Sequence, residues 1–289
     1  MSSIDKLTEV TELVSYILYS DYVKLDLDHK EVALSAMIIA RVESGKTAVI
    51  NQFVPNDGIL VMSDVTQYGL LHDYLDDMKS GAVHRILIPD LINPVNRKQD
   101  TVNTLITFFN SYISWEGVNS ISTYAMPNIR LANPLRGSLL TTIATGDFNR
   151  MMRRMSAVGF MSRLIPITYE YSQEAVREIL LDIAHGRDKW DYIKLDFPKS
   201  KVDVRCDPIL AEQLMKVSEV VGTKSGGYAF RSLHQFMVLA RSRALAMGRD
   251  NVNTEDVERV KYLISRFVKY PESADVDAMN GISECDEEE

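Results

Sequence analysis

One segment near the N-terminus restricts the folds open to this chain more than any other. The apolar residues 35–39 lead into a turn that ends in Gly45, Lys46 and Thr47. After a buried strand, a Gly-Lys-Thr turn that opens a helix directs backbone N–H groups at a phosphate. The lysine then reaches the outer phosphates, and the threonine hydroxyl can bind magnesium. The segment therefore predicts a strand, a phosphate-binding turn and a helix in direct succession.

The turn departs from the usual pattern at its first position. A phosphate-binding loop of this kind begins with glycine, and here Ala40 occupies that place, with four residues between it and Gly45. Alanine tolerates a positive φ less well than glycine, so we expect Ala40 to disturb the loop wherever that conformation is needed. The predicted nucleotide contacts are Glu43, Ser44, Gly45, Lys46, Thr47 and Ala48.

Apolar segments that read as strands alternate with helical patterns through the first part of the chain. Strands that alternate with helices form a parallel sheet with helices on both faces, and the ligand binds at the carboxyl ends of the strands. The sequence thus predicts an α/β fold in which Lys46 and Asp90 lie at one edge, with Pro166 in an edge strand. The expected strands cover residues 35–40, 58–63, 84–90, 138–145 and 164–169.

The pattern of the chain divides it into four parts. An amphipathic helix is expected within residues 1–24, an α/β core at 25–171, a helical lid at 172–271 and an acidic disordered tail at 272–289. Within the lid, Thr254 is the expected N-cap of the last helix. The tail holds eight acidic residues and no lysine or arginine, so the rest of the chain carries no net charge. Such a tail can serve solubility, mask a basic groove or bind a basic partner.

Composition excludes several classes of protein. The apolar runs are too short to span a bilayer, and the N-terminus lacks the apolar core of a signal peptide. Cys206 and Cys285 are isolated and the five histidines are scattered, which supports neither a disulfide framework nor a zinc site. We therefore expect a cytoplasmic protein with reduced thiols and no membrane partner.

The order of motifs over residues 25–270 resembles the AAA+ ATPase superfamily, and most of all its minichromosome maintenance helicase branch. In that branch a hairpin precedes the strand of the first sensor residue, a Ser-Arg-Phe segment follows, and an arginine opens a long lid helix. The corresponding pieces here are residues 121–135, residues 142–147, Ser162-Arg163-Leu164 and Phe230-Arg231. The resemblance implies an AAA+-like P-loop NTPase sheet followed by a helical lid.

The same resemblance implies a role for individual residues. Lys46 and Thr47 would contact phosphate and magnesium, and Asp90 would be the Walker B aspartate that holds Mg²⁺ through water. Thr145 takes the place of the first sensor. Arg163 would be an arginine finger that enters the neighbouring subunit's site, and Arg231 the second sensor in the lid. ATP and Mg²⁺ are the implied cofactors, and a homo-oligomer, a ring such as a hexamer or a filament, is the implied assembly.

One departure concerns catalysis. A Walker B aspartate is normally followed by a glutamate that polarises water, yet Leu91 follows Asp90. Slow hydrolysis is therefore expected, with Glu116 as one candidate for the missing acid. The candidate DNA contacts are Arg130 and Arg136, because the corresponding hairpin lines the central channel of hexameric helicases.

The resulting functional hypothesis is an oligomeric ATPase that couples ATP binding and hydrolysis to nucleic-acid remodelling or translocation, as a helicase-like motor or a helicase loader in DNA replication. The alternative is a nucleotide-dependent switch or scaffold with little or no hydrolysis, which Ala40 and Leu91 would both suit. A third reading is a protein-remodelling chaperone with Tyr68 in its pore loop. Single-stranded DNA stimulation of hydrolysis would separate the first and third readings.

Overall fold

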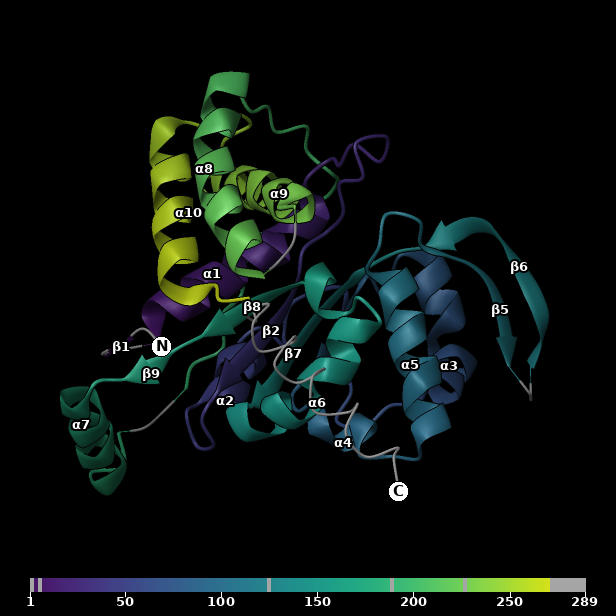
Figure 1. Ribbon diagram of the computed structural model, residues 1–289, viewed down its shortest axis with the longest axis horizontal. Helices are drawn as coiled ribbons and strands as arrows, with labels where there is room; N and C mark the ends of the chain where they lie inside the picture. Colours follow the sequence, from purple (N-terminus) through teal and green to yellow (C-terminus); the bar gives the residue numbers. More distant parts are fainter. Residues whose placement is uncertain (1–2, 5–6, 124–125, 188–189, 226–227, 271–289) are drawn as a thin grey trace, which may run out of the picture.

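The computed structural model describes residues 3–4, 7–123, 126–187, 190–225 and 228–270 (Figure 1). They form an α/β fold with a parallel five-stranded sheet and a C-terminal helical region, which confirms the predicted fold class. The expected acidic tail, residues 272–289, lies outside the described residues together with Cys285.

The central sheet has the strand order β3-β4-β7-β2-β8, and every neighbouring pair is parallel. β7 therefore lies between the strand that precedes the Gly-Lys-Thr turn and the strand that precedes Asp90. Pro166 lies in the edge strand β8, as predicted, where a missing backbone N–H is tolerated. The strands are β2 (Ser35–Ala40), β3 (Ile59–Val61), β4 (Arg85–Ile88), β7 (Ser138–Ala144) and β8 (Leu164–Thr168).

Alternating side chains of β2 supply two separate cores. Ala36 and Ile38 belong to the core that α1, α2 and the helical region cover, whereas Met37 and Ile39 belong to the core under α3, α5 and α6. Both faces of the sheet are thus buried, which explains the continuous apolar sequence of β2. These helices are α1 (Thr8–Tyr19), α2 (Lys46–Asn51), α3 (Gln67–Ser80), α5 (Gln99–Tyr112) and α6 (Thr145–Ala157), and a short α4 (Ile92–Val95) follows β4.

The helical region differs from the expected lid. α8 (Pro208–Ser225), α9 (Phe230–Ala246) and α10 (Thr254–Phe267) pack together, and α1 from the start of the chain packs against α9. α7 (Gln173–Ala184) lies apart from them and follows β9 (Glu170–Tyr171), which pairs with β1 (Ser3–Ile4) (Figure 1). Periodicity identified the helices but not the face against which each one packs.

Two local predictions are wrong. Asn253, not Thr254, is the N-cap of α10, because its side chain accepts the backbone N–H of Asp256 while Asp256 accepts that of Asn253. The predicted hairpin exists as antiparallel β5 (Val118–Thr123) and β6 (Met126–Leu135), which project from the body of the molecule (Figure 1). The sequence suggests two strands joined by a turn at Pro127 and Asn128, but both residues lie inside β6.

Within the described residues, no helix combines the length and the apolar character that a membrane span needs. This agrees with the hydropathy of the sequence.

Candidate functional site

The carboxyl ends of the central strands carry the residues that sequence reasoning selected first. β2 ends at Ala40, a five-residue loop follows, and Lys46 opens α2. Lys46 is 9% exposed, and its Nζ donates to the backbone carbonyl of Arg41 at 2.6 Å. Burial lowers the pKa of Lys46, and the nearby carboxylates of Asp90 and Asp147 oppose that shift. The lysine is thus folded against its own loop within reach of two acids.

The expected defect at Ala40 is absent. Ala40 is the last residue of β2 and does not have a positive φ; the left-handed residues of the loop are Glu43, at φ 60°, and Gly45, at φ 78°. A Cβ at position 45 would also make a tight contact, 3.1 Å, with Leu7 Cδ1. The loop therefore closes without glycine at its first position, because that position is extended.

Two tyrosines fix the tip of the loop. Tyr169 and Tyr171 both donate a hydroxyl to the carbonyl of Ser44, at 2.9 Å and 3.0 Å. Burial raises the pKa of Tyr171 to about 12 and that of Tyr169 further, so both hydroxyls keep their protons. Ser44 is 8% exposed, and its Oγ has no hydrogen-bond partner among the described residues. A buried hydroxyl without a partner is costly, so Ser44 is available to a ligand.

The end of β4 lies directly beside this loop. Thr47 Oγ1 is 3.4 Å from the carbonyl of Pro89, and Thr142 on β7 donates to the same carbonyl at 2.6 Å. Asp90 is half-buried, and its Oδ1 accepts the backbone N–H of Ile92 at 3.1 Å. Oδ1 of Asp90 therefore stabilises the turn, whereas Oδ2 accepts no hydrogen bond from the described residues of the turn.

Thr145 completes the group at the carboxyl edge. It is the first residue of α6 and directly follows β7, the strand between β4 and β2. Its Oγ1 is buried and has no partner among the described residues. The structure thus brings together Lys46, Thr47, Asp90 and Thr145. Strand positions in the sequence predicted this for Lys46 and Asp90, and the family resemblance selected Thr145.

Sequence reasoning missed one acid and misplaced another. Asp147, in the first turn of α6, acts electrostatically on Lys46 and forms an ion pair with Arg150. Glu116 instead acts on Arg163, at the opposite edge of the sheet, so it does not replace the acid missing after Asp90. The signal for Asp147 was its place two residues after the expected sensor at a strand end.

A cavity of about 650 Å³ adjoins the loop. Ser44 and Gly45 form one wall, and Tyr171, Ile179 of α7 and Trp190 form others. Its size is in the range of ligand pockets, and its lining combines apolar and aromatic side chains with polar and charged ones, Glu178, Asp182 and Arg187 among them. The cavity is thus suited to a planar apolar group attached to a phosphate in the loop.

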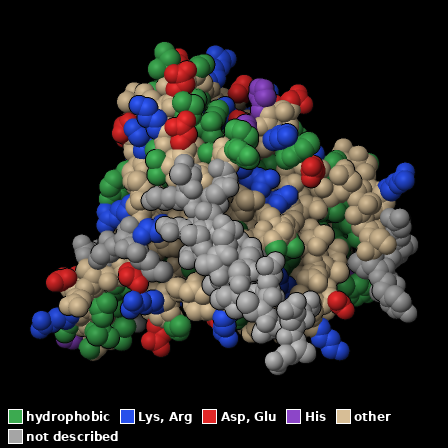
Figure 2. Space-filling view, viewed as in Figure 1, with side chains coloured by type: hydrophobic (Ala, Val, Ile, Leu, Met, Phe, Trp, Pro, Cys, Tyr) green, Lys and Arg blue, Asp and Glu red, His purple; other side chains and the backbone are tan. Residues whose placement is uncertain are grey.

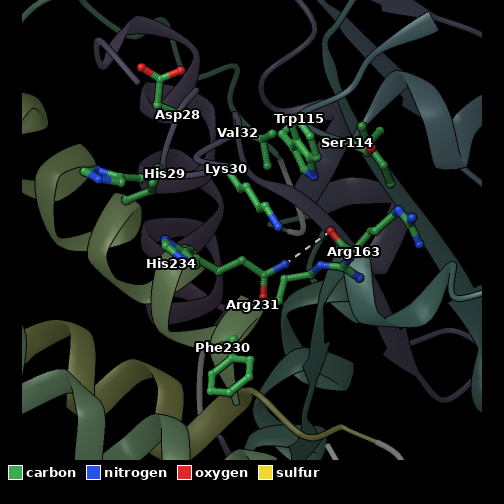
Figure 3. Close-up of a pocket in the computed structure, with 13 residues that line it drawn as sticks. Asp28, His29, Lys30, Val32, Ser114, Trp115, Arg163, Phe230, Arg231 and His234 are labelled. Atoms are coloured by element: carbon green, nitrogen blue, oxygen red, sulfur yellow. Dashed lines mark hydrogen bonds between the residues drawn. The ribbon is translucent and has the colours of Figure 1, made fainter. Parts of the chain in front are cut away.

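Arg163 and Arg231 lie together, but far from Lys46 along the strands. Arg163 ends the short helix η2 (Met161–Arg163), directly before β8, whose first residue pairs with the first residue of β2. Arg163 Nη1 donates to Gly159 O at 2.7 Å, and Arg231 Nη1 donates to Ser162 Oγ. Burial and the charge of Arg231 lower the pKa of Arg163. The two arginines share a pocket of about 520 Å³ at the amino edge (Figure 3).

The two candidate DNA contacts occupy different places. Arg130 is exposed on β6 of the projecting hairpin. Arg136 follows β6, and its Nε donates to the carbonyl of Trp115 at 2.7 Å. Arg136 therefore belongs to the amino edge of the sheet and Arg130 to the hairpin beyond it.

No protein-family model matches the chain, and no curated protein matches its sequence. The structure supports an α/β domain with a parallel five-stranded sheet followed by a helical region, and it assigns no family. Functional roles therefore depend on the geometry of the two edges.

Proposed function

We propose that the chain is an oligomeric ATPase that couples ATP binding and hydrolysis to remodelling of, or movement along, nucleic acid. The observation that carries the proposal is the group at the carboxyl edge: Lys46, Asp90 and Thr145 after three adjacent strands, with Lys46 buried beside two carboxylates. A lysine, a hydroxyl and a carboxylate around a Gly-Lys-Thr turn are the groups that phosphoryl transfer requires.

The loop residues would divide the nucleotide between them. Lys46 would exchange the carbonyl of Arg41, 2.6 Å away, for phosphate oxygens. Backbone N–H groups of residues 43–48 would contact the remaining phosphate oxygens. The base would enter the cavity beside Ser44 and lie against Tyr171 and Trp190. Ser44 Oγ, which lacks a partner among the described residues, would gain one.

The residues present also fit Mg²⁺. Thr47 supplies a hydroxyl, and Asp90 supplies a carboxylate with one oxygen outside its turn. Magnesium is commonly bound by one or two carboxylates together with substrate phosphates, and it neutralises charge on the transferred group. Thr145, with its buried hydroxyl, would orient the attacking water. Asp147 lies two residues after Thr145 and would accept the proton of that water.

The position of the arginines favours a shared site. Arg163 and Arg231 lie at the amino edge, whereas Lys46 lies at the carboxyl edge of the same sheet. Side chains at the two ends of a strand do not reach one phosphate, so both arginines would act on the nucleotide of a neighbouring copy. A head-to-tail assembly of this kind produces a ring or a filament. Planar guanidinium groups stabilise the charge of a transferred phosphoryl group.

A nucleotide-dependent switch is the second candidate. Leu91 follows Asp90, and Glu116 lies with Arg163, so the acid that usually follows a Walker B aspartate has no direct replacement. In that case Asp147 would stay paired with Arg150 and binding alone would drive the change of state. The two candidates differ only in turnover.

The test measures phosphate release and binding of a fluorescent ATP analogue for the wild type and Lys46→Ala. We expect the substitution to weaken both, with hydrolysis reduced about 100-fold, since it removes a group that stabilises transferred charge. Lys216→Ala, which changes an exposed lysine on α8, is the matched control and should behave as the wild type.

Each measurement is repeated with single-stranded DNA and at several protein concentrations. Turnover that rises with DNA and faster than linearly with protein supports the motor. Nucleotide binding with no more turnover than Lys46→Ala supports the switch. Equal nucleotide binding by wild type and Lys46→Ala would overturn both.

A further inference from the structure

A second cavity, of about 530 Å³, adjoins the pocket of Arg163 and Arg231 at the amino edge. Val32 and Ser114 line both, so the two cavities are neighbours, and together we call them the amino-edge groove. In Figure 2, Lys and Arg side chains gather at the junction between the helical region and the rest of the molecule. The basic residues of the groove are Lys24, Lys30, Arg136, Arg163, Lys199, Lys201 and Arg231.

Backbone hydrogen bonds hold one wall of the groove in place. The N–H of Lys24 donates to Val202 O, and the N–H of Val202 donates to Tyr22 O, both at 2.8 Å. This short parallel bridge fixes the segment of Lys199 and Lys201 beside Lys24. Tyr22 also stacks on Phe197, with ring centroids 4.4 Å apart. Three lysines from distant parts of the sequence therefore share one wall.

Trp115 joins the two halves of the groove. Its carbonyl accepts the Nε of Arg136, and its ring lies 5.4 Å from Lys30 Nζ. In Figure 3, Lys30, Arg163 and Arg231 lie between Trp115 and Phe230. Trp115 is 37% exposed and Phe230 is 74% exposed. The groove thus interleaves cations with two accessible aromatic rings.

Few acids balance this charge. Lys24, Lys30, Arg136, Lys199 and Lys201 form no ion pair with any carboxylate in the part of the chain that the structure describes, whereas other arginines are paired with acids, such as Arg97 with Asp64.

Acids also lie in and beside the groove. Glu31 acts electrostatically on His234 but is buried and paired with Arg241, and Asp57 acts electrostatically on Tyr22. Asp21 is 8% exposed and is bound by Arg85 and Ser138. Asp28 directs its carboxylate away from the labelled cations in Figure 3, and Glu116 acts on Arg163. The exposed lysines of the groove and Arg136 therefore keep charge that no carboxylate among the described residues pairs with, and this charge is open to an anionic ligand.

We propose that the amino-edge groove binds single-stranded nucleic acid. The unpaired lysines and Arg136 would follow the phosphates, because a row of cations without local acids suits a polyanion. Trp115 and Phe230 would stack on bases, which requires bases that are not paired in a duplex. The inference rests on the proposed function in taking nucleic acid as the ligand. The groove ends at Arg163 and Arg231, so bound nucleic acid would lie next to the residues assigned to the neighbour's nucleotide.

The test measures fluorescence anisotropy of a fluorescein-labelled oligothymidine with the full chain. The triple variant Lys24→Glu, Lys199→Glu, Lys201→Glu should bind at least about tenfold more weakly. The slope of log K against the logarithm of the salt concentration should become about two units shallower, as expected for three lost phosphate contacts. The control triple variant Lys98→Glu, Lys216→Glu, Lys269→Glu changes exposed lysines outside the groove and should bind as the wild type. Trp115→Ala should weaken binding of the oligonucleotide without changing the salt dependence.

Further arms separate this inference from the proposed ATPase. Lys46→Ala should retain oligonucleotide binding, and the groove variant should retain binding of the fluorescent ATP analogue, which also shows that it folds. If the single variant Lys201→Glu and the groove triple variant both bind DNA as the wild type does, the inference is wrong. This holds even if the protein binds ATP as proposed. Equal or tighter binding of a duplex of the same length, or no binding by the wild type, would also overturn it.

Discussion

The two edges of the central sheet carry opposite chemistry. At the carboxyl edge, one buried lysine faces Asp90 and Asp147 within a closed loop. At the amino edge, seven basic residues line an open groove, and its buried acid, Asp21, is already bound by Arg85. A single chain therefore carries cationic groups at both ends of the same strands. Under the two proposals above, one edge would bind a compact anion with a metal, and the other an extended anion or a neighbour's nucleotide.

The edges also differ in how they are held. Short hydrogen bonds from Tyr169, Tyr171 and Thr142 position the carboxyl edge. The amino edge depends on a buried ion pair in which Arg85 Nε donates to Asp21 Oδ2 at 2.8 Å, and Ser138 Oγ donates to Oδ1 at 3.0 Å. Loss of the Arg85–Asp21 pair should therefore affect stability first, and loss of Lys46 should affect chemistry first.

The largest effect is expected at the buried pair. Arg85 is 1% exposed, so Arg85→Met leaves the charge of Asp21 without its partner. We expect a loss of about 3–5 kcal/mol in the free energy of unfolding, measured with urea. Adding Asp21→Asn should restore part of the loss, since the uncompensated charge is then removed. An Arg85→Met protein as stable as the wild type would show that the buried ion pair between Arg85 and Asp21 does not stabilise the amino edge.

The second prediction concerns whether the edges act in the same copy. Lys46→Ala and Arg163→Ala should each reduce hydrolysis about 100-fold when alone. After co-expression in equal amounts, about one quarter of the sites should combine an intact Lys46 with a neighbour's intact Arg163, as a head-to-tail interface requires. Phosphate release by the mixture should rise accordingly. If the mixture stays as slow as its parts, Arg163 does not act across subunits.

The smallest effect is expected at Ala40. Because Ala40 is fully buried at the end of β2 and does not have a positive φ, Ala40→Gly offers no conformational gain. We expect nucleotide affinity to stay the same and the free energy of unfolding to fall by about 1 kcal/mol, because glycine loses more entropy in a strand. Titration with the fluorescent ATP analogue and urea unfolding measure the two quantities. Tighter nucleotide binding would show that Ala40 limits the nucleotide affinity of the carboxyl edge.

Local patterns predicted most of the α/β fold and the carboxyl-edge group. The alternation of apolar strands with helices identified the parallel sheet, and Asp90 was found because it follows a strand, whereas Thr145 was selected through the family resemblance. The same patterns failed where packing decides. They assigned α7 to the helical lid, placed Pro127 in a turn and suggested Glu116 as a partner of Asp90. None of these errors could be detected from neighbouring residues alone.

The sequence by itself determined the Gly-Lys-Thr turn after a buried strand, the α/β class and the edge position of Pro166, because each depends on residues close together in the chain. Only the tertiary structure decided that Arg163 and Arg231 share one pocket and that Lys24 lies beside the segment of Lys201. Strand order and long-range backbone bonds set these distances. They arise from the burial of two apolar faces at once, which no local pattern encodes.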